Sequence, residues 1–196
     1  MTYASSTTAL LLAAGRGTRF DSTGVQDKLL APLPDGTPVA CAAARALLAV
    51  LPHVTAVVRP GAEALAHALN DAGCDVVFST DAERGMGASL AAGIRATHEA
   101  EGWIIALADM PWIASATVEQ IARRIDSGAS IVAPVYRGQR GHPVGFGAMH
   151  CEALSSLDGD VGARRILEAA NVTAIDVDDP GVLADVDTYA DLHRQP

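Results

Sequence analysis

Glycine and basic residues occur together in one short segment near the start of the chain. The sequence Gly15-Arg16-Gly17-Thr18-Arg19 directly follows an apolar run at 8–13. Glycines let backbone N–H groups approach phosphate oxygens closely, and Arg16, Arg19 and the later Lys28 add positive charge that suits a phosphate. The segment therefore predicts a phosphate-binding loop, and an ordinary connection between a strand and a helix is the alternative.

Two better-known phosphate-binding motifs do not fit this segment. A dinucleotide fingerprint G-x-G-x-x-G requires glycine where Phe20 stands. A Walker A loop requires a lysine that is followed by serine or threonine, whereas Leu29 follows Lys28. The segment by itself therefore assigns the chain neither to the dinucleotide-binding proteins nor to the P-loop proteins.

Acidic residues in two later segments suit a divalent cation. Asp109 follows an apolar stretch at 103–108, and Asp185 and Asp187 alternate about a single valine. Mg²⁺ usually takes only one or two carboxylates and completes its octahedron with water and substrate phosphates. We therefore expect Asp109 to be one metal ligand and either Asp185 or Asp187 to be the second. Helix capping is the alternative for Asp109 and for Asp187.

Strand-like and helix-like patterns alternate through most of the chain and must position these residues. Strands are predicted at 8–13, 54–58, 75–78, 103–108, 131–135, 143–146 and 173–177, and helices at 39–50, 62–71, 88–100, 115–126, 164–170 and 188–193. Ser115 is the expected cap of the 115–126 helix. This order predicts one α/β domain over residues 1–196, with a Rossmann-like, doubly wound and mostly parallel sheet. Ligands of such sheets bind beyond the carboxyl ends of the strands.

Composition and charge exclude several classes of protein. With 14 Lys and Arg against 23 Asp and Glu, the net charge is −9, which disfavours nucleic acid and anionic membranes as partners. The 3 cysteines are widely spaced, so we expect core residues and not a disulfide framework or a zinc site. The apolar run at 9–14 is too short for a signal sequence or a membrane span. We therefore expect a soluble, cytoplasmic protein.

Taken together and in order, the motifs resemble those of the MobA-like nucleotidyltransferases, in particular the molybdenum cofactor cytidylyltransferases. The segments that carry the resemblance extend over nearly the whole chain: 12–19 with 28–33, 85–90, 107–111, 134–144, 159–164, and 179–181 followed by 185–188. The resemblance implies a fold of the nucleotide-diphospho-sugar transferase type. It also implies an Mg²⁺-dependent transfer of CMP from CTP to molybdopterin, with release of pyrophosphate.

The resemblance also assigns roles on the nucleotide side of the site. Lys28, Arg19 and Asp109 would be catalytic residues, and Asp109 and Asp187 would bind Mg²⁺. Nucleotide binding would fall to a set of mostly small residues together with two basic ones: Leu12, Ala13, Ala14, Gly15, Arg16, Gly17, Lys28, Gly85 and Ser89.

On the acceptor side, the resemblance points to Arg140, His142 and Asp160. A structural or solvent-facing role is the alternative for His142, because it stands in a turn between Gly141 and Pro143. For Asp160 the alternative is a cap at the start of the following helix.

Departures from the family pattern leave other functions open. Phe20 stands where methionine is usual, the 21–27 stretch is longer, Gly87-Ala88 replaces serines, and Tyr189-Ala190 replaces Pro-Glu. A transferase that uses GTP, or a sugar or polyol phosphate as acceptor, is therefore one alternative. Another is a non-catalytic protein that binds a nucleotide or the molybdenum cofactor and delivers it to a molybdoenzyme or its maturation factor. The presence of all the charged residues expected at the site favours catalysis.

Overall fold

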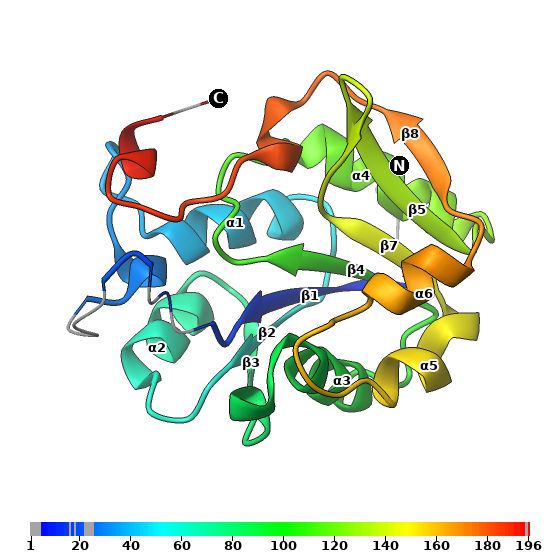
Figure 1. The fold of residues 1–196 in the computed structure, drawn as a ribbon, viewed down its shortest axis with the longest axis horizontal. Coiled ribbons are helices and arrows are strands. Elements are labelled where there is room, and N and C mark those ends of the chain that lie inside the picture. Colours follow the sequence, from blue (N-terminus) through cyan, green and yellow to red (C-terminus); the bar gives the residue numbers. More distant parts are fainter. Residues whose placement is uncertain (1–4, 16, 18, 22–25, 195) are drawn as a thin grey trace.

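An eight-stranded mixed sheet forms the centre of the protein (Figure 1). In this computed structural model, residues 5–15, 17, 19–21, 26–194 and 196 are described. The spatial order is β3-β2-β1-β4-β7-β5-β6, and β8 pairs with β5. The strands are β1 (Thr7–Ala13), β2 (Val54–Val58), β3 (Asp75–Phe78), β4 (Gly102–Leu107), β5 (Ile131–Tyr136), β6 (Gln139–Arg140), β7 (Val144–Gly147) and β8 (Thr173–Asp176).

Parallel pairs dominate the part of the sheet that is built around β1. β1 pairs in parallel with both β2 and β4, and β2 pairs in parallel with β3. β5 and β8 are also parallel, whereas β7 runs antiparallel to β4 and β5, and β6 antiparallel to β5. The predicted α/β fold with a mostly parallel sheet is therefore confirmed.

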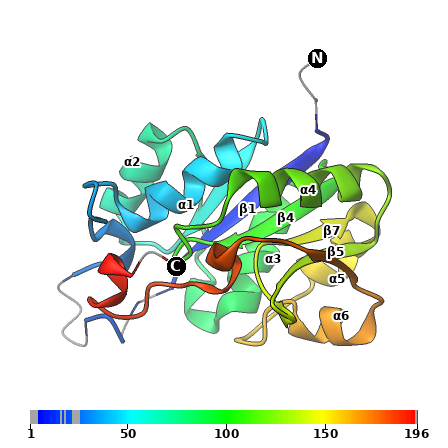
Figure 2. The ribbon, with the colours of Figure 1, turned by 90° about the horizontal axis from the view of Figure 1, so that it is seen from above.

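Helices cover both faces of the sheet (Figures 1 and 2). One core cluster joins the sheet to α1 (Val39–Leu48), α2 (Glu63–Asp71) and α4 (Ser115–Asp126). A second cluster joins it to α3 (Met86–Ala96), α5 (Cys151–Ser155) and α6 (Arg164–Ala169). Leu11 of β1 belongs to the first cluster and Leu10 to the second, as the alternation of side chains along a strand requires. The continuous apolar pattern of β1 follows from burial on both faces.

Short elements account for most differences from the predicted arrangement. The five-residue helix α5 is too short to give a periodic signal, and the predicted closing helix is only a 3₁₀ turn at Asp191–His193. Further 3₁₀ turns are η1 (Lys28–Leu30), η2 (Ala82–Arg84), η3 (Ala148–His150) and η4 (Pro180–Leu183).

The prediction that Ser115 caps α4 was wrong. Ser115 is the first residue of the helix, and Ala114 holds the capping position without a side-chain hydrogen bond. The buried carboxylate of Asp179 replaces that cap, because it accepts hydrogen bonds from the Ala114 amide at 2.9 Å and from the Thr117 hydroxyl at 2.7 Å. A partner far away in sequence thus satisfies the helix terminus.

Cys41 and Cys74 are buried and Cys151 is half-buried, and all three are free thiols. Within the part of the chain that the structure describes, no helix combines the length and the hydropathy that crossing a membrane requires.

Candidate active site

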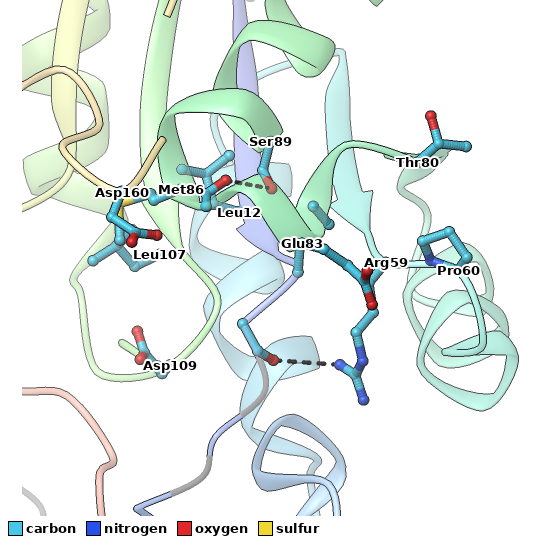
Figure 3. Close-up of a pocket in the computed structure, with 14 residues that line it drawn as sticks. Leu12, Arg59, Pro60, Thr80, Glu83, Met86, Ser89, Leu107, Asp109 and Asp160 are labelled. Carbon is cyan, nitrogen blue, oxygen red and sulfur yellow. Dashed lines mark hydrogen bonds between the residues drawn. The ribbon is translucent and has the colours of Figure 1, made fainter. Parts of the chain in front are cut away.

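A cavity of about 560 Å³ opens beyond the carboxyl ends of the parallel strands (Figure 3). Residues after β1, β2, β3 and β4 form much of its wall, and the start of α3 forms another part. Its lining comprises Leu12, Ala14, Gly15, Arg59, Pro60, Thr80, Ala82, Glu83, Gly85, Met86, Ser89, Leu107, Asp109 and Asp160. This is the edge at which parallel α/β sheets bind ligands.

Three carboxylates gather at this edge. One oxygen from each of Asp109, Asp185 and Asp187 can be chosen so that all three lie within 4.8 Å of one another. The amide of Val186 donates to the Asp109 carbonyl at 2.8 Å, which holds the C-terminal segment against the end of β4. The sequence left Asp185 and Asp187 as alternatives, and the structure brings both to Asp109.

Two cationic side chains contact the acidic cluster of Asp109, Asp185 and Asp187. The ammonium group of Lys28 lies 2.8 Å from Asp109 Oδ2 and 3.5 Å from Asp187 Oδ1. The guanidinium of Arg19 lies 2.5 Å from Asp187 Oδ2. Lys28 is buried, whereas the carboxylates of Asp109 and Asp187 are partly open to solvent. The predicted catalytic residues thus meet at one point.

The electrostatics of the cluster favour a bound cation. Loss of hydration, followed by the nearby charges of Asp187 and Asp109, raises the pKa of the Asp185 carboxyl above its ordinary value. Crowded carboxylate oxygens are the donors that hard divalent cations prefer. The donor set therefore fits Mg²⁺ or a similar ion.

Local structure around Lys28 fixes the path of its side chain. The carboxylate of Asp27 caps η1 by accepting a hydrogen bond from the Leu29 amide at 3.0 Å. Gly17 has a φ of 59°, and a Cβ atom there would lie 3.1 Å from the Cβ of Lys28. Both the backbone conformation and the close approach therefore favour glycine at position 17.

The C-terminal segment that carries Asp187 is held by two other aspartates. Asp179 accepts a hydrogen bond from the Gly181 amide at 3.0 Å, in addition to its bonds to the start of α4. Asp191 accepts hydrogen bonds from the amides of Asp187 at 3.2 Å and Thr188 at 2.7 Å. The carboxylate of Asp191 therefore orders the chain at Asp187.

The loop at residues 159–160 packs against the start of α3 beside the cavity. Gly85 has a φ of 119°, and a Cβ atom there would meet the backbone of Gly159 at 2.6 Å and also collide with the Asp160 carboxylate. Asp160 lines the cavity and does not cap α6, whose capping position is Ala163. The hydroxyl of Ser89 also faces the cavity and donates to the Gly85 carbonyl at 3.3 Å (Figure 3).

His142 and Arg140 lie outside the cavity lining. Arg140 is exposed on β6, and the amide of His142 donates to the Val182 carbonyl at 2.9 Å. Burial, assisted by the Arg140 charge and opposed by the Asp109 carboxylate, lowers the pKa of His142. The buried Nδ1 of His142 has no hydrogen-bond partner among the described residues. This atom is therefore a candidate contact for a ligand.

The predicted nucleotide-binding residues divide into four groups by position. Five of them line the cavity, namely Leu12, Ala14, Gly15, Gly85 and Ser89. Gly17 packs on Lys28 beside the acidic cluster, and Ala13 is instead buried in the core. Arg16 lies outside the described residues.

Several residues of the cavity wall were missed from the sequence. Arg59 and Thr80 follow β2 and β3, just as Gly15 and Asp109 follow β1 and β4. The rule that singled out Asp109, a polar residue beyond the carboxyl end of a predicted parallel strand, also applies to Arg59 and Thr80. Glu83 had no comparable signal, since it lies in the short turn η2.

Comparison with known proteins agrees with this geometry. Residues 9–174 match the family model described as a MobA-like NTP transferase domain. The chain belongs to the MobA-like nucleotidyltransferase family. The family assignment and the fold together confirm the resemblance to the MobA-like nucleotidyltransferases that the sequence motifs carried.

Individual relatives cover nearly the full length. The nicotine blue oxidoreductase of Paenarthrobacter nicotinovorans is 34% identical over 95% of both chains. The crystal structure of Rv0371c from Mycobacterium tuberculosis is 30% identical, covers 97% of this chain and 96% of its own, and gives a TM-score of 0.79. A structure of Rv0371c in complex with manganese gives 0.77 at 28% identity, over 96% of this chain and 97% of its own. A nucleotidyl transferase from Methanothermobacter is 26% identical with a TM-score of 0.79, over 94% and 93% of the two chains.

Proposed function

We propose that this MobA-like nucleotidyltransferase transfers CMP from CTP to molybdopterin and releases pyrophosphate. The observation that carries the proposal is the meeting of Lys28 with Asp109 and Asp187 beside the cavity at the carboxyl edge of the sheet. A buried cation and a set of carboxylates at one point suit a substrate that carries phosphates and a divalent metal ion.

The nucleotide occupies the cavity in this proposal. Gly15 and Gly85 leave the backbone accessible in the cavity lining, and Ser89 offers a hydroxyl there. Lys28 and Arg19 neutralise the charge that grows on the pyrophosphate leaving group. In exchange, these two side chains give up part of their pairing with the carboxylates.

Asp109, Asp185 and Asp187 would hold Mg²⁺ in this site. The manganese complex of the relative Rv0371c and the close approach of the three carboxylates support a divalent ion. Such an ion, when bound, supplies charge neutralisation and orientation for the phosphates.

The acceptor approaches from the side of His142 and Arg140, with Asp160 on the cavity wall. Nδ1 of His142 is available for a hydrogen bond, and Arg140 supplies an exposed guanidinium for an acceptor phosphate. An acceptor phosphate is already a nucleophile, so that alignment opposite the leaving group is the main requirement and a strong general base is not needed. A molybdoenzyme or its maturation factor would receive the product.

Product analysis with each nucleoside triphosphate tests the proposal. Purified protein, Mg²⁺ and molybdopterin are incubated with CTP, GTP, ATP or UTP, and both pyrophosphate and the nucleotide adduct are measured. The proposal predicts the fastest adduct formation with CTP. Faster reaction with GTP, or with a sugar or polyol phosphate as acceptor, would reassign the substrate. Tight binding of molybdopterin without turnover would instead support a delivery protein.

An oxidoreductase is a second candidate, because the relative from Paenarthrobacter carries that name at 34% identity over 95% of both chains. The pairing of Lys28 with carboxylates favours phosphate transfer over redox chemistry. A spectrophotometric assay with nicotine blue and a reduced nicotinamide dinucleotide separates the two candidates. Turnover in that assay, without nucleotide transfer, would replace the first candidate by the second.

A further inference from the structure

Arg59 contacts both ends of the loop that connects β1 to η1. It follows β2 and lines the cavity, and its Nη1 donates to the Gly15 carbonyl at 3.3 Å (Figure 3). Its Nη2 lies 3.3 Å from Asp27 Oδ2. One guanidinium therefore contacts the residue just beyond β1 and the residue just before η1.

Asp27 connects Arg59 to the turn that carries Lys28. The other carboxylate oxygen of Asp27 caps η1 through the Leu29 amide. Lys28 is the first residue of η1, and its ammonium group reaches Asp109 at 2.8 Å. The position of Lys28 thus depends on a carboxylate that Arg59 holds on its other side.

The chemistry of these contacts requires arginine. A planar guanidinium can donate along two directions to two separate acceptors, whereas a lysine ammonium acts as a single compact charge on a flexible stem. The side chains of Arg59 and Asp27 are 27% and 20% exposed, so that solvent screens this pair less than a surface pair.

We propose that Arg59 is a positioning residue for the nucleotide. Arg59 fixes Gly15 and Asp27 relative to each other and thereby holds Lys28 where it can contact the triphosphate. The identity of the substrate rests on the proposed function, but the effect of Arg59 on η1 does not. The proposal predicts that loss of the arginine lowers kcat/KM, because a displaced Lys28 binds the triphosphate less well and neutralises less of the charge on the leaving group.

Steady-state kinetics with CTP test the kinetic part of the proposal. Arg59→Gln should lower kcat/KM for CTP about tenfold, the loss typical of one charge-assisted hydrogen bond. Arg59→Lys should restore only part of kcat/KM, because it keeps the charge and loses the fork. Arg95→Gln is the matched control, since Arg95 also bonds a carbonyl, that of Ser155 at 2.9 Å, outside the cavity lining. An unchanged kcat/KM in Arg59→Gln would overturn the proposal.

Asp27 supplies the second half of the test. Asp27→Asn retains an oxygen for the Leu29 amide and loses the charge that faces Arg59, so its kcat/KM should fall as in Arg59→Gln. The double variant should show no further fall, because contacting residues are not additive. Additive effects, or a wild-type kcat/KM in Asp27→Asn, would mean that Arg59 acts on the nucleotide directly and would overturn the positioning role.

Amide hydrogen exchange of a peptide covering residues 26–33 gives a readout that does not need turnover. Arg59→Gln should speed exchange in this peptide, and Arg95→Gln should leave it at the wild-type rate. Wild-type exchange in Arg59→Gln would overturn the inference even if the enzyme is active. Faster exchange in a protein that transfers no nucleotide would support the inference and reject the proposed function.

Discussion

At the scale of single residues, the pairing of Lys28 with the acidic cluster carries most of the argument. The Lys28 side chain is only 10% exposed, and carboxylate oxygens lie 2.8 and 3.5 Å from its ammonium group. A buried ammonium group is costly unless such partners compensate it. The lysine is therefore both a balance to the carboxylates and the cation best placed to meet a phosphate.

Replacement of this lysine should affect the reaction strongly. Lys28→Ala is expected to lower kcat/KM by about 3–4 kcal/mol of transition-state stabilisation, as removal of one preorganised electrostatic donor does. Initial rates of pyrophosphate release measure this loss. Arg164→Ala, at an exposed residue of α6 that pairs with Glu168, serves as the control. An unchanged kcat/KM in Lys28→Ala would remove the lysine from the site.

His142 should make the stability of the fold depend on pH. Mainly because of burial, the pKa of the folded imidazole lies below its ordinary value of 6.5. Between these two pKa values the unfolded chain binds more protons, so the free energy of unfolding increases with pH. The contribution of neutral His142 is fully present above about pH 6.5 and is lost as the pH falls toward the lowered pKa.

Urea denaturation between about pH 5 and 8 measures this dependence around the ordinary pKa of histidine. His142→Asn should flatten the decrease in stability toward low pH, although His150, whose pKa burial also lowers, retains part of it. His98→Asn, at an exposed histidine, should keep the wild-type profile. An equal slope in wild type and His142→Asn would show that this ring does not titrate as proposed.

At the scale of elements, a few long-range hydrogen bonds connect the secondary structure to the site. Asp179 joins the start of α4 to η4, and the segment that follows η4 carries Asp185 and Asp187. The acidic cluster therefore depends on how this segment docks, as well as on the strand that ends before Asp109.

Removal of the Asp179 carboxylate should weaken both stability and metal binding. Asp179→Ala leaves the donors of Ala114, Thr117 and Gly181, two of which belong to buried residues, without their acceptor, at a cost of about 2–3 kcal/mol in the free energy of unfolding. Chemical denaturation and Mn²⁺ titration measure the two effects. Asp178→Ala, at the exposed neighbour, should stay within about 0.5 kcal/mol of wild type. Equal stability of the two variants would contradict the docking role.

Long elements were predicted well from the sequence because their patterns are local. The buried strands read as continuous apolar runs, and helices such as α4 carry a clear amphipathic period. Contacts between distant segments give no such pattern. Phe20 and Tyr189 both depart from the family motifs, and their rings stack 4.5 Å apart at 22°. The sequence identified both positions as departures from the family motifs, but it could not show that the two rings are in contact.

At the scale of the whole molecule, topology explains why so much of the candidate site could be anticipated. Parallel strands end at the same edge, so Gly15 and Asp109 were expected together before their neighbours were known. The same rule would have added Arg59 and Thr80. The joint approach of Asp185 and Asp187 to Asp109 had to come from the structure, because the fold of the C-terminal segment is set by Asp179 and not by a local pattern.

The distribution of charge is also a property of the whole molecule. The chain carries a net charge of −9, yet Lys28, Arg19 and Arg59 lie together at the carboxyl edge of the sheet. Local cations in an acidic protein favour a small phosphate-bearing ligand with its metal ion over a long polyanion.

Pyrophosphate release as a function of Mg²⁺ concentration, in wild type and in Asp109→Asn, tests the central claim most directly. Asp178→Asn is the matched control for the loss of one negative charge. Wild type and the control should release pyrophosphate from CTP in the presence of molybdopterin, with the same saturable dependence on Mg²⁺. Asp109→Asn should require more Mg²⁺ and react at least about 100-fold more slowly, the scale of losing one electrostatic contact in the transition state. A wild-type rate and metal response in Asp109→Asn would contradict the account.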